Sequence, residues 1–174
     1  MSLFQHKTNT DLKAKELMDV ILDFEAYPQI VSSVKKTEIL KQGPPVWEVV
    51  FAIEVIRNFE YTLRLELRSE YELHWSLVNG FFVKNNGFWI LEPVEDEARD
   101  EARDEAQDET RHETLVTYGV EMEMDTYLPT SIRNSLARHK LPKMVDGFIQ
   151  EAKMRAMAKI IERSVLSGTD QDEN

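Results

Sequence analysis

The sequence predicts an α+β domain in which helices cover one face of an antiparallel sheet. Three observations predict this fold class: a helical pattern of apolar residues opens the chain, alternating patterns typical of strands fill its middle, and a long helical pattern closes it. The expected strands follow one another without helices between them, which favours antiparallel pairing over the crossover connections of a parallel sheet. The 174 residues, 42% of them hydrophobic and 30% charged, suffice for one globular core.

The first helix is expected over residues 8–24, opened by capping-type residues. Its apolar positions recur at helical spacing and are Ala14, Leu17, Met18, Ile21 and Leu22. The pair Tyr27 and Pro28 is expected to end this helix, because the residue before a proline is pushed out of the α region. Residues 29–33 are expected to form one further turn.

Six strands are expected where the period of the apolar pattern changes to two. Their ranges are residues 35–41, 46–55, 58–69, 71–78, 86–93 and 114–124, with a turn at residues 42–45. Alternation is clearest in residues 58–69, where apolar and aromatic side chains take every second position from Phe59 to Leu67, and polar ones such as Arg64 take the others. One face of the sheet is therefore expected to be covered and the other to face water.

The closing helical stretch is expected after Leu128 and Pro129, to about Leu166, with a bend or interruption at Pro142. Its apolar stripe consists of Val145, Phe148, Ile149, Ala152, Ala156 and Ile160. This stripe is expected to pack on the apolar face of the sheet.

The net charge of -11 is concentrated in two short segments. Residues 95–113 hold ten acidic and three basic side chains, and the tail 170–174 holds three acidic ones, so the rest of the chain carries a net charge of only about -1. A near-neutral body lacks the clustered Lys and Arg that nucleic-acid binding requires. No direct nucleic-acid partner is expected.

Residues 95–113 form an acidic low-complexity insertion between two expected strands, built on a four-residue repeat in residues 96–111. On a helix this period would stack like charges at i, i+4, so a hairpin insertion with marginal helicity is expected. Two interpretations stay open: a solvated acidic loop, or a docking element for a basic protein partner or divalent cations. Residues 167–174 are expected to be a disordered acidic tail.

The absence of cysteine excludes disulfides, thiol nucleophiles and Cys-based metal sites, and fits a reducing compartment. The first ten residues lack the apolar run of a signal peptide, and no apolar window has the length of a membrane span. A cytoplasmic location without a membrane span is expected.

Motifs that carry chemistry are missing from the sequence. The histidines His6, His74, His112 and His139 show no metal-ligand spacing, and neither a nucleotide-binding glycine loop nor a serine nucleophile motif occurs. Asp19 and Asp23 would share one face of the first helix, either as paired carboxylates or, more simply, as a solvated pair. No catalytic residue, metal site or cofactor is expected.

The aromatic residues lie mostly on or beside expected strands and on the last helix. They include Phe51, Phe59, Tyr61, Trp75, Phe81, Phe82, Phe88, Trp89, Tyr118 and Phe148. Two interpretations are open. They fill an ordinary core, or several of them line a pocket in which Tyr61 and Tyr118 supply polar groups to an apolar wall.

Several short motifs resemble one superfamily in their order along the chain. They are residues 22–28 (LDFEAYP), 75–78, 79–82 (NGFF), 87–91 (GFWIL), 114–118 and 128–129. Over about residues 4–162, apart from the acidic insertion, the sequence resembles the START-like (SRPBCC) superfamily. Within it, the sequence is similar to the branch of polyketide cyclase/dehydrase-type proteins, coenzyme Q-binding START proteins and the ribosome-association toxin.

The resemblance implies a helix-grip fold, in which a curved seven-stranded antiparallel sheet wraps around the C-terminal helix and encloses an apolar cavity. It implies one START-like domain over residues 1–166, with short helices near the N-terminus and a first strand at about residues 3–8. The candidates for lining the cavity are Phe51, Tyr61, Leu63, Leu65, Trp75, Leu77, Trp89, Tyr118, Met122, Phe148 and Ala152.

Three functions are compatible with this resemblance. The first is a binding or carrier protein for a lipid, quinone or polyketide-like molecule, and the second is a protein-interaction module of the ribosome-association toxin kind. The third is an aromatase/cyclase-type enzyme that would use Tyr61, Tyr118, His74 or Arg64. Because His74 and Arg64 fall on the expected water-facing side of the sheet, the sequence favours binding of a hydrophobic molecule.

Overall fold

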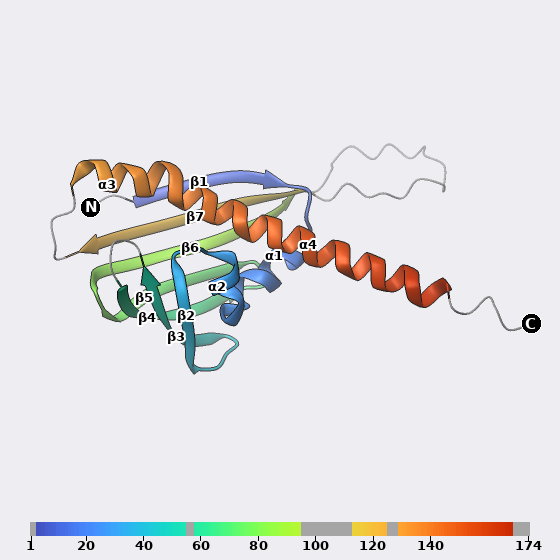
Figure 1. Ribbon diagram of the computed structural model, residues 1–174, viewed down its shortest axis with the longest axis horizontal. Coiled ribbons are helices and arrows are strands. Elements are labelled where there is room, and N and C mark those ends of the chain that lie inside the picture. Colours follow the sequence, from blue (N-terminus) through green and yellow to red (C-terminus); the bar gives the residue numbers. More distant parts are fainter. Residues whose placement is uncertain (1–2, 55–57, 95–112, 125–128, 169–174) are drawn as a thin grey trace, which may run out of the picture.

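A computed structural model describes residues 3–54, 58–94, 113–124 and 129–168 (Figure 1). The strands are β1 (Leu3–Thr10), β2 (Val34–Lys41), β3 (Val46–Glu54), β4 (Asn58–Ser69), β5 (Glu72–Gly80), β6 (Phe82–Val94) and β7 (Glu113–Met124). The helices are α1 (Ala14–Ile21), a 3-10 turn (Phe24–Ala26), α2 (Tyr27–Ile30), α3 (Thr130–Ser135), a π-helical turn (Leu136–Lys140) and α4 (Leu141–Gly168). Residues 95–112, which hold most of the expected acidic insertion, and most of the expected acidic tail lie outside the described residues.

The strands form one seven-stranded antiparallel sheet in the order β1-β7-β6-β5-β4-β3-β2. β2 to β7 are neighbours in sequence order, and β1 closes the sheet beside β7. The sheet curves along α4, which crosses one of its faces, while α1 and α2 lie near the same helix (Figure 1). The α+β class and the helix-grip arrangement are confirmed.

The N-terminal prediction of a helix from residue 8 is wrong. Residues Thr8 to Thr10 belong to β1 and pair with Val116 to Thr114 of β7. The helix begins at Ala14, where the backbone N–H of Lys13 donates to the Glu16 carboxylate at 3.1 Å. The strand implied by the resemblance is therefore confirmed, and it is two residues longer than expected.

Pro28 starts a helix instead of only ending one. α1 stops at Ile21, and α2 begins at Tyr27 with Pro28 in its first turn. A proline is well tolerated there because the N–H groups of a first turn have no partner within the helix. The pattern near Pro28 therefore marks a junction between two helices.

The apolar face of α4 is confirmed over its first half. Val145, Phe148, Ile149 and Ala152 are buried against the sheet, but Ile160 is 63% exposed, so its place in the core stripe was wrong. The reason is visible in Figure 1, where α4 continues well past the end of the sheet. The interruption expected near Pro142 is present as the π-helical turn that directly precedes α4.

Candidate functional site

A chain of aromatic rings lies between the sheet and α4. Trp89 on β6 and Tyr118 on β7 are direct partners in the sheet, and their ring centroids are 4.7 Å apart. Trp75 of β5 approaches Tyr118 at 5.6 Å, and Phe148 of α4 approaches Trp89 at 5.4 Å. Edge-to-face and tilted contacts of this kind add to the free energy that area burial alone provides.

From Phe148, a second row of aromatic rings in the same cluster extends toward β3 and β4. Tyr27 of α2 contacts Phe148 at 5.0 Å and Phe51 at 5.7 Å. Phe51 stacks on Tyr61 at 5.6 Å, and Tyr61 meets Phe82 at 5.0 Å. The contact between Tyr27 and Phe148 joins the two rows of rings. Aromatic side chains therefore occupy much of the space between α4 and the sheet.

All eleven candidate lining residues face this space, because they occupy alternating inward positions on their strands or the buried face of α4. The buried ones are Phe51, Leu63, Leu65, Trp75, Trp89, Tyr118, Phe148 and Ala152. Tyr61, Leu77 and Met122 are partly buried and pack against the same cluster. The structure thus brings the candidates together, while their contact with a ligand stays a prediction.

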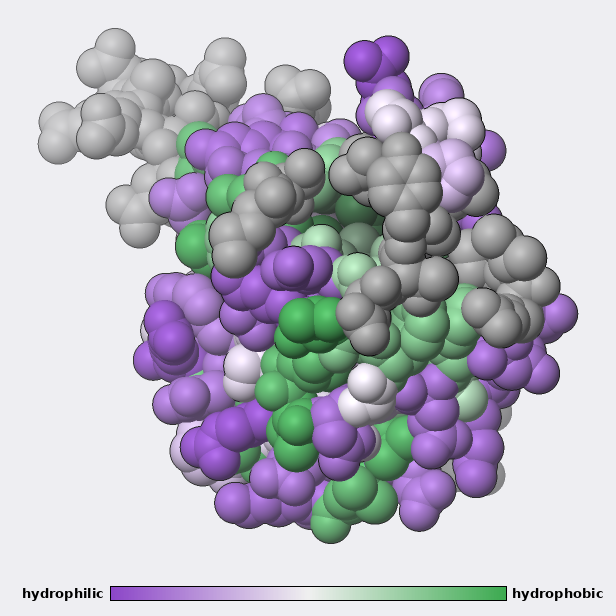
Figure 2. Space-filling view, turned by 90° about the vertical axis from the view of Figure 1, so that its left-hand side faces the viewer, coloured by the Kyte–Doolittle hydropathy of each residue, from purple (hydrophilic) through white to green (hydrophobic). Residues whose placement is uncertain are grey.

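The two ends of the cluster differ in how completely they are covered. At the α1 end, Leu17, Ile21, Phe24 and Leu73 are at most 1% exposed. At the opposite end, where β4 and β6 begin and α3 lies, Tyr61 and Met122 are only partly buried. Figure 2 looks at this second end and shows apolar surface between hydrophilic flanks.

Three tyrosine hydroxyls lie within the cluster, and only one has a partner among the described residues. The Tyr27 hydroxyl donates to the Ile21 carbonyl oxygen at 2.6 Å. The hydroxyls of Tyr61 and Tyr118 form no hydrogen bond with any described group. Since the described residues include no fully buried side-chain oxygen that lacks a partner, neither hydroxyl is sealed in the core away from both solvent and hydrogen-bonding groups.

Burial raises the pKa of Tyr27, Tyr61 and Tyr118 far above that of a free phenol. All three hydroxyls therefore stay protonated at neutral pH and can donate a hydrogen bond. Neither Tyr61 nor Tyr118 can serve as a general base at this pH, because the phenolate form is suppressed.

The alkaline stability of the protein follows from these raised pKa values. Above pH about 10 the unfolded chain loses phenolic protons that the folded chain keeps, so the free energy of unfolding is expected to fall as pH rises. The expected slope is about 1.4 kcal/mol per pH unit for each of the three tyrosines. Denaturant titrations at several alkaline pH values measure the free energy of unfolding and hence this slope. Tyr118→Phe is expected to reduce the slope by about 1.4 kcal/mol per pH unit. An unchanged slope in that variant would contradict the assignment.

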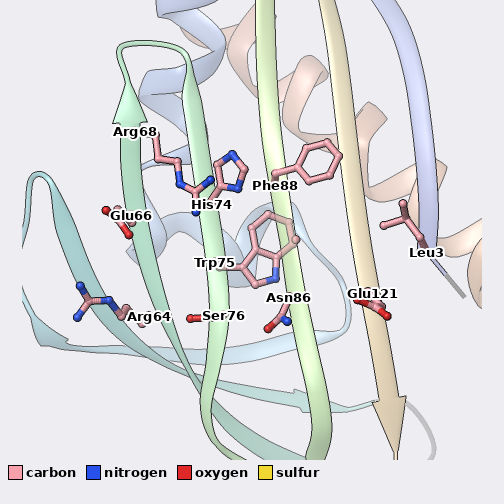
Figure 3. A pocket seen from close by; sticks show the side chains of 11 residues that line it. Leu3, Arg64, Glu66, Arg68, His74, Trp75, Ser76, Asn86, Phe88 and Glu121 are labelled. Carbon is pink, nitrogen blue, oxygen red and sulfur yellow. The ribbon is translucent and has the colours of Figure 1, made fainter. Parts of the chain in front are cut away.

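The outer face of the sheet carries the histidine and arginine of the enzyme hypothesis. Arg64 and His74 point away from α4, in alternation with the buried Leu65 and Trp75. They line an open hollow of about 380 Å³ on that face (Figure 3). The His74 ring contacts the Glu72 carboxylate at 2.5 Å. The sheet therefore separates these two groups from the inward-facing tyrosines.

The sheet ladder between β5 and β6 is short. The backbone pairs of β5 and β6 run from Glu72 opposite Ile90 to Trp75 opposite Gly87. Beyond Trp75, hydrogen bonds to two asparagine side chains of β6 connect the strands. The Trp75 indole N–H donates to the buried Asn85 carboxamide at 3.1 Å, and the Leu77 N–H donates to Asn86 at 3.4 Å. The sequence analysis missed these asparagines, because asparagine in a strand region carries no burial signal.

The ionisable groups of the described residues show no cluster of three or more His, Cys, Asp or Glu that could hold a metal ion. Asp19 and Asp23 do not act as a pair, since Asp19 binds Lys15 and Asp23 binds Arg155 in separate ion pairs. In the part of the chain that is described, no helix is long and apolar enough to cross a membrane.

The sequence and fold match known proteins. The family model described as polyketide cyclase/dehydrase and lipid transport matches residues 10–149. No curated protein matches the sequence.

Solved structures match at low sequence identity. A START superfamily protein from Mycobacterium smegmatis is 16% identical with a TM-score of 0.69, over 87% of this chain and 97% of the other. A protein from Thermus thermophilus is 10% identical with a TM-score of 0.69, over 88% and 99%. The Zhui aromatase/cyclase from Streptomyces sp. R1128 is 15% identical with a TM-score of 0.66, over 89% and 95%. At these identities the likeness establishes the fold alone.

Proposed function

Because the chain belongs to the polyketide cyclase/dehydrase and lipid transport family, we propose that it binds a hydrophobic small molecule between its sheet and α4. The observation that carries this proposal is the pair of tyrosine hydroxyls without hydrogen-bond partners among the described residues. Tyr61 and Tyr118 place two protonated donors in a wall that is otherwise aromatic and aliphatic. An apolar wall with a few polar groups is the usual composition of a small-molecule site.

The chemistry of the wall defines the class of ligand. A largely apolar molecule with a carbonyl or hydroxyl group would bury its body among Trp75, Trp89 and Phe148 and accept a hydrogen bond from a tyrosine. Lipids, quinones and polyketide-like molecules have this composition. A fully charged ligand would have to be desolvated among these mostly apolar side chains with little compensation.

The entry route is the end of the cluster near α3. Side chains there are only partly buried, so a ligand can reach Tyr61 first and Tyr118 after displacing neighbouring apolar groups. The opposite end is closed by the fully buried residues of α1. We therefore expect the polar group of the ligand to reach the tyrosines while part of its apolar body stays near the α3 end.

The binding itself is tested by native mass spectrometry of the protein after mild extraction, followed by thermal shifts with long-chain fatty alcohols, short-chain quinones and aromatic polyketide mimics. We expect co-purifying hydrophobic material and a higher melting temperature with at least one of these probe classes. A clean mass of the free protein together with no shift for any probe would overturn the proposal.

The tyrosine pair supplies the sharper prediction. Tyr61→Phe and Tyr118→Phe are each expected to weaken binding of the probe about 5- to 10-fold, because a hydrogen bond contributes about 1 kcal/mol, while stability in the absence of ligand changes little. Tyr27→Phe is the matched control: it removes a hydroxyl bonded to Ile21, so it should lower stability by about 1–2 kcal/mol and leave binding unchanged. Titration calorimetry and denaturant unfolding separate the two effects. Equal binding losses in all three variants would contradict a specific role for Tyr61 and Tyr118.

A further inference from the structure

The open hollow of about 380 Å³ on the outer face of the sheet has no part in the proposed function (Figure 3). It lies where the backbone pairing of β5 and β6 ends at Trp75 and Gly87, and both residues line it. Figure 3 shows the Trp75 ring in the interval between the two strands, and Gly87 has no side chain that could cover this interval. The indole ring and the backbone therefore form the floor of the hollow. Its volume is within the usual range of small-molecule sites.

Two apolar side chains lie beside this floor on the outer face. Phe88 of β6 is partly buried, and its ring lies over Gly119 of β7, where an added Cβ would be 2.4 Å from a ring atom. Leu3 of β1 is 61% exposed and lines the same hollow. A flat apolar molecule that packs on Trp75, Phe88 and Leu3 would remove apolar surface from water, which favours binding.

The charged residues of the lining favour an anion. Glu121 binds Lys84 at 2.7 Å, so its charge is compensated. Arg64, Arg68 and Glu66 also line the hollow, and none of the three forms an ion pair with a described residue. Among the lining residues, more positive than negative charge therefore lacks a described partner. The hollow offers this positive charge on a chain whose net charge is -11.

We propose that this hollow binds a small organic anion with a flat apolar body, such as an aromatic carboxylate. We call it the outer site and define it by Arg68, His74, Trp75 and Phe88. The planar guanidinium of Arg68 can hold a carboxylate through two parallel hydrogen bonds, while the rings of Trp75 and Phe88 contact the apolar body. The outer site does not depend on the proposed function, because the sheet separates it from the space beside α4.

The directions of the two arginines determine how such a ligand lies. In Figure 3, Arg68 extends toward His74 at one end of the hollow, whereas Arg64 extends away from Trp75. The anionic group is therefore expected at Arg68, with the apolar body over Trp75 and beside Phe88.

A polyanion fits the outer site less well than a small molecule. Nucleic-acid binding depends on several clustered cations that contact successive phosphates. The outer site instead turns one arginine toward the ligand. Glu66, which pairs with His74 across the strands, and Glu72, which contacts the His74 ring, would repel further phosphate groups.

The test uses 2-naphthoate as the probe, added to the full-length protein and followed by backbone amide shifts in NMR spectra. A dissociation constant of about 0.1–1 mM is expected for a molecule of this size. The largest shift changes are expected at Trp75, Asn86 and Phe88, and small ones at Phe148 on α4. Acetate, which lacks the apolar body, should not bind in this range. Changes confined to Phe148 and its neighbours would overturn the proposal, as would the absence of any change up to about 10 mM naphthoate.

Two arginine variants test where the anionic group lies. Arg68→Gln is expected to weaken naphthoate binding about 10-fold, because a charge-assisted hydrogen bond to the carboxylate is lost. Arg64→Gln is the matched control, since it makes the same change of charge on the same face of β4. It should weaken binding less than about 2-fold, because a separated, exposed charge is screened by solvent and salt.

Both arginines are exposed, so neither variant should alter the fold, which circular dichroism verifies. Equal losses of affinity in the two variants would overturn the proposal, and so would an unchanged affinity in Arg68→Gln.

Discussion

Replacing Phe148 with alanine is expected to lower the free energy of unfolding by about 3–5 kcal/mol. Phe148 is 1% exposed, and its ring meets Tyr27 of α2 at 5.0 Å and Trp89 of β6 at 5.4 Å. Two elements, α2 and β6, therefore border the space that the missing ring would leave, and neither can move into it without losing its own contacts. Denaturant unfolding of the two proteins measures the difference.

The matched control is Leu40→Ala on β2, which removes a large apolar side chain that is 57% exposed. Its expected effect is below about 1 kcal/mol, because little buried surface is lost. If Phe148→Ala were as mild as this control, α4 would not depend on the aromatic cluster. Phe148→Ala also bears on the ligand proposal. The cavity that it leaves beside Trp89 should admit a bulkier hydrophobic probe than the unchanged protein accepts.

The strands that the sequence predicts best are those with a strict division between their faces. β4 begins and ends where predicted, because every inward position from Phe59 to Leu67 is apolar or aromatic, and its outward positions are mostly charged. β1 gives no such signal. Its inward positions include His6, Thr8 and Thr10 beside Phe4, so periodicity alone cannot distinguish it from a polar N-terminal segment.

The helices show a different limit of sequence analysis. The apolar spacing of α4 correctly identifies Val145, Phe148 and Ala152 as core, yet it assigns Ile160 to the same stripe. A helical pattern records which residues share a side of the helix, but it does not record where the sheet beneath them ends. Ile160 lies beyond that point, so only the tertiary structure reveals that it is exposed.

The sequence predicts that the candidate residues gather on one side of the sheet, whereas their role in binding a ligand stays a prediction. Inward positions of strands and of α4 converge in any helix-grip fold, which is why the named residues gather in one cluster. The partners of individual polar groups depend on register and side-chain conformation. The bond between Trp75 and Asn85, and the different surroundings of the Tyr27 and Tyr118 hydroxyls, therefore could not be read from the residue pattern.

Replacing Gly87 with alanine is expected to destabilise the protein by about 3 kcal/mol or more, the upper part of the range for overpacked sites. A Cβ at Gly87 would lie 2.1 Å from the Trp75 ring and 2.4 Å from the Gly119 carbonyl oxygen. The carbonyl belongs to the backbone of β7 and cannot rotate away, so Trp75 or the strand itself must shift. Either movement disturbs the hydrogen bond from Trp75 to Asn85, which connects β5 and β6 where their backbone pairing ends.

Gly147→Ala is the matched control, because Gly147 lies in α4 and a Cβ there would approach the Ile30 carbonyl oxygen at 3.2 Å. Alanine favours a helix over glycine by about 1 kcal/mol, so this gain should offset most of the tight contact and leave stability nearly unchanged. Denaturant unfolding compares the two variants, and tryptophan fluorescence is expected to shift only in Gly87→Ala, where Trp75 is displaced. Similar unfolding energies for both would indicate that the Trp75 ring can leave Gly87 freely. In that case the bond from the Leu77 N–H to Asn86, and not the bond between Trp75 and Asn85, would hold β5 and β6 together beyond the paired residues.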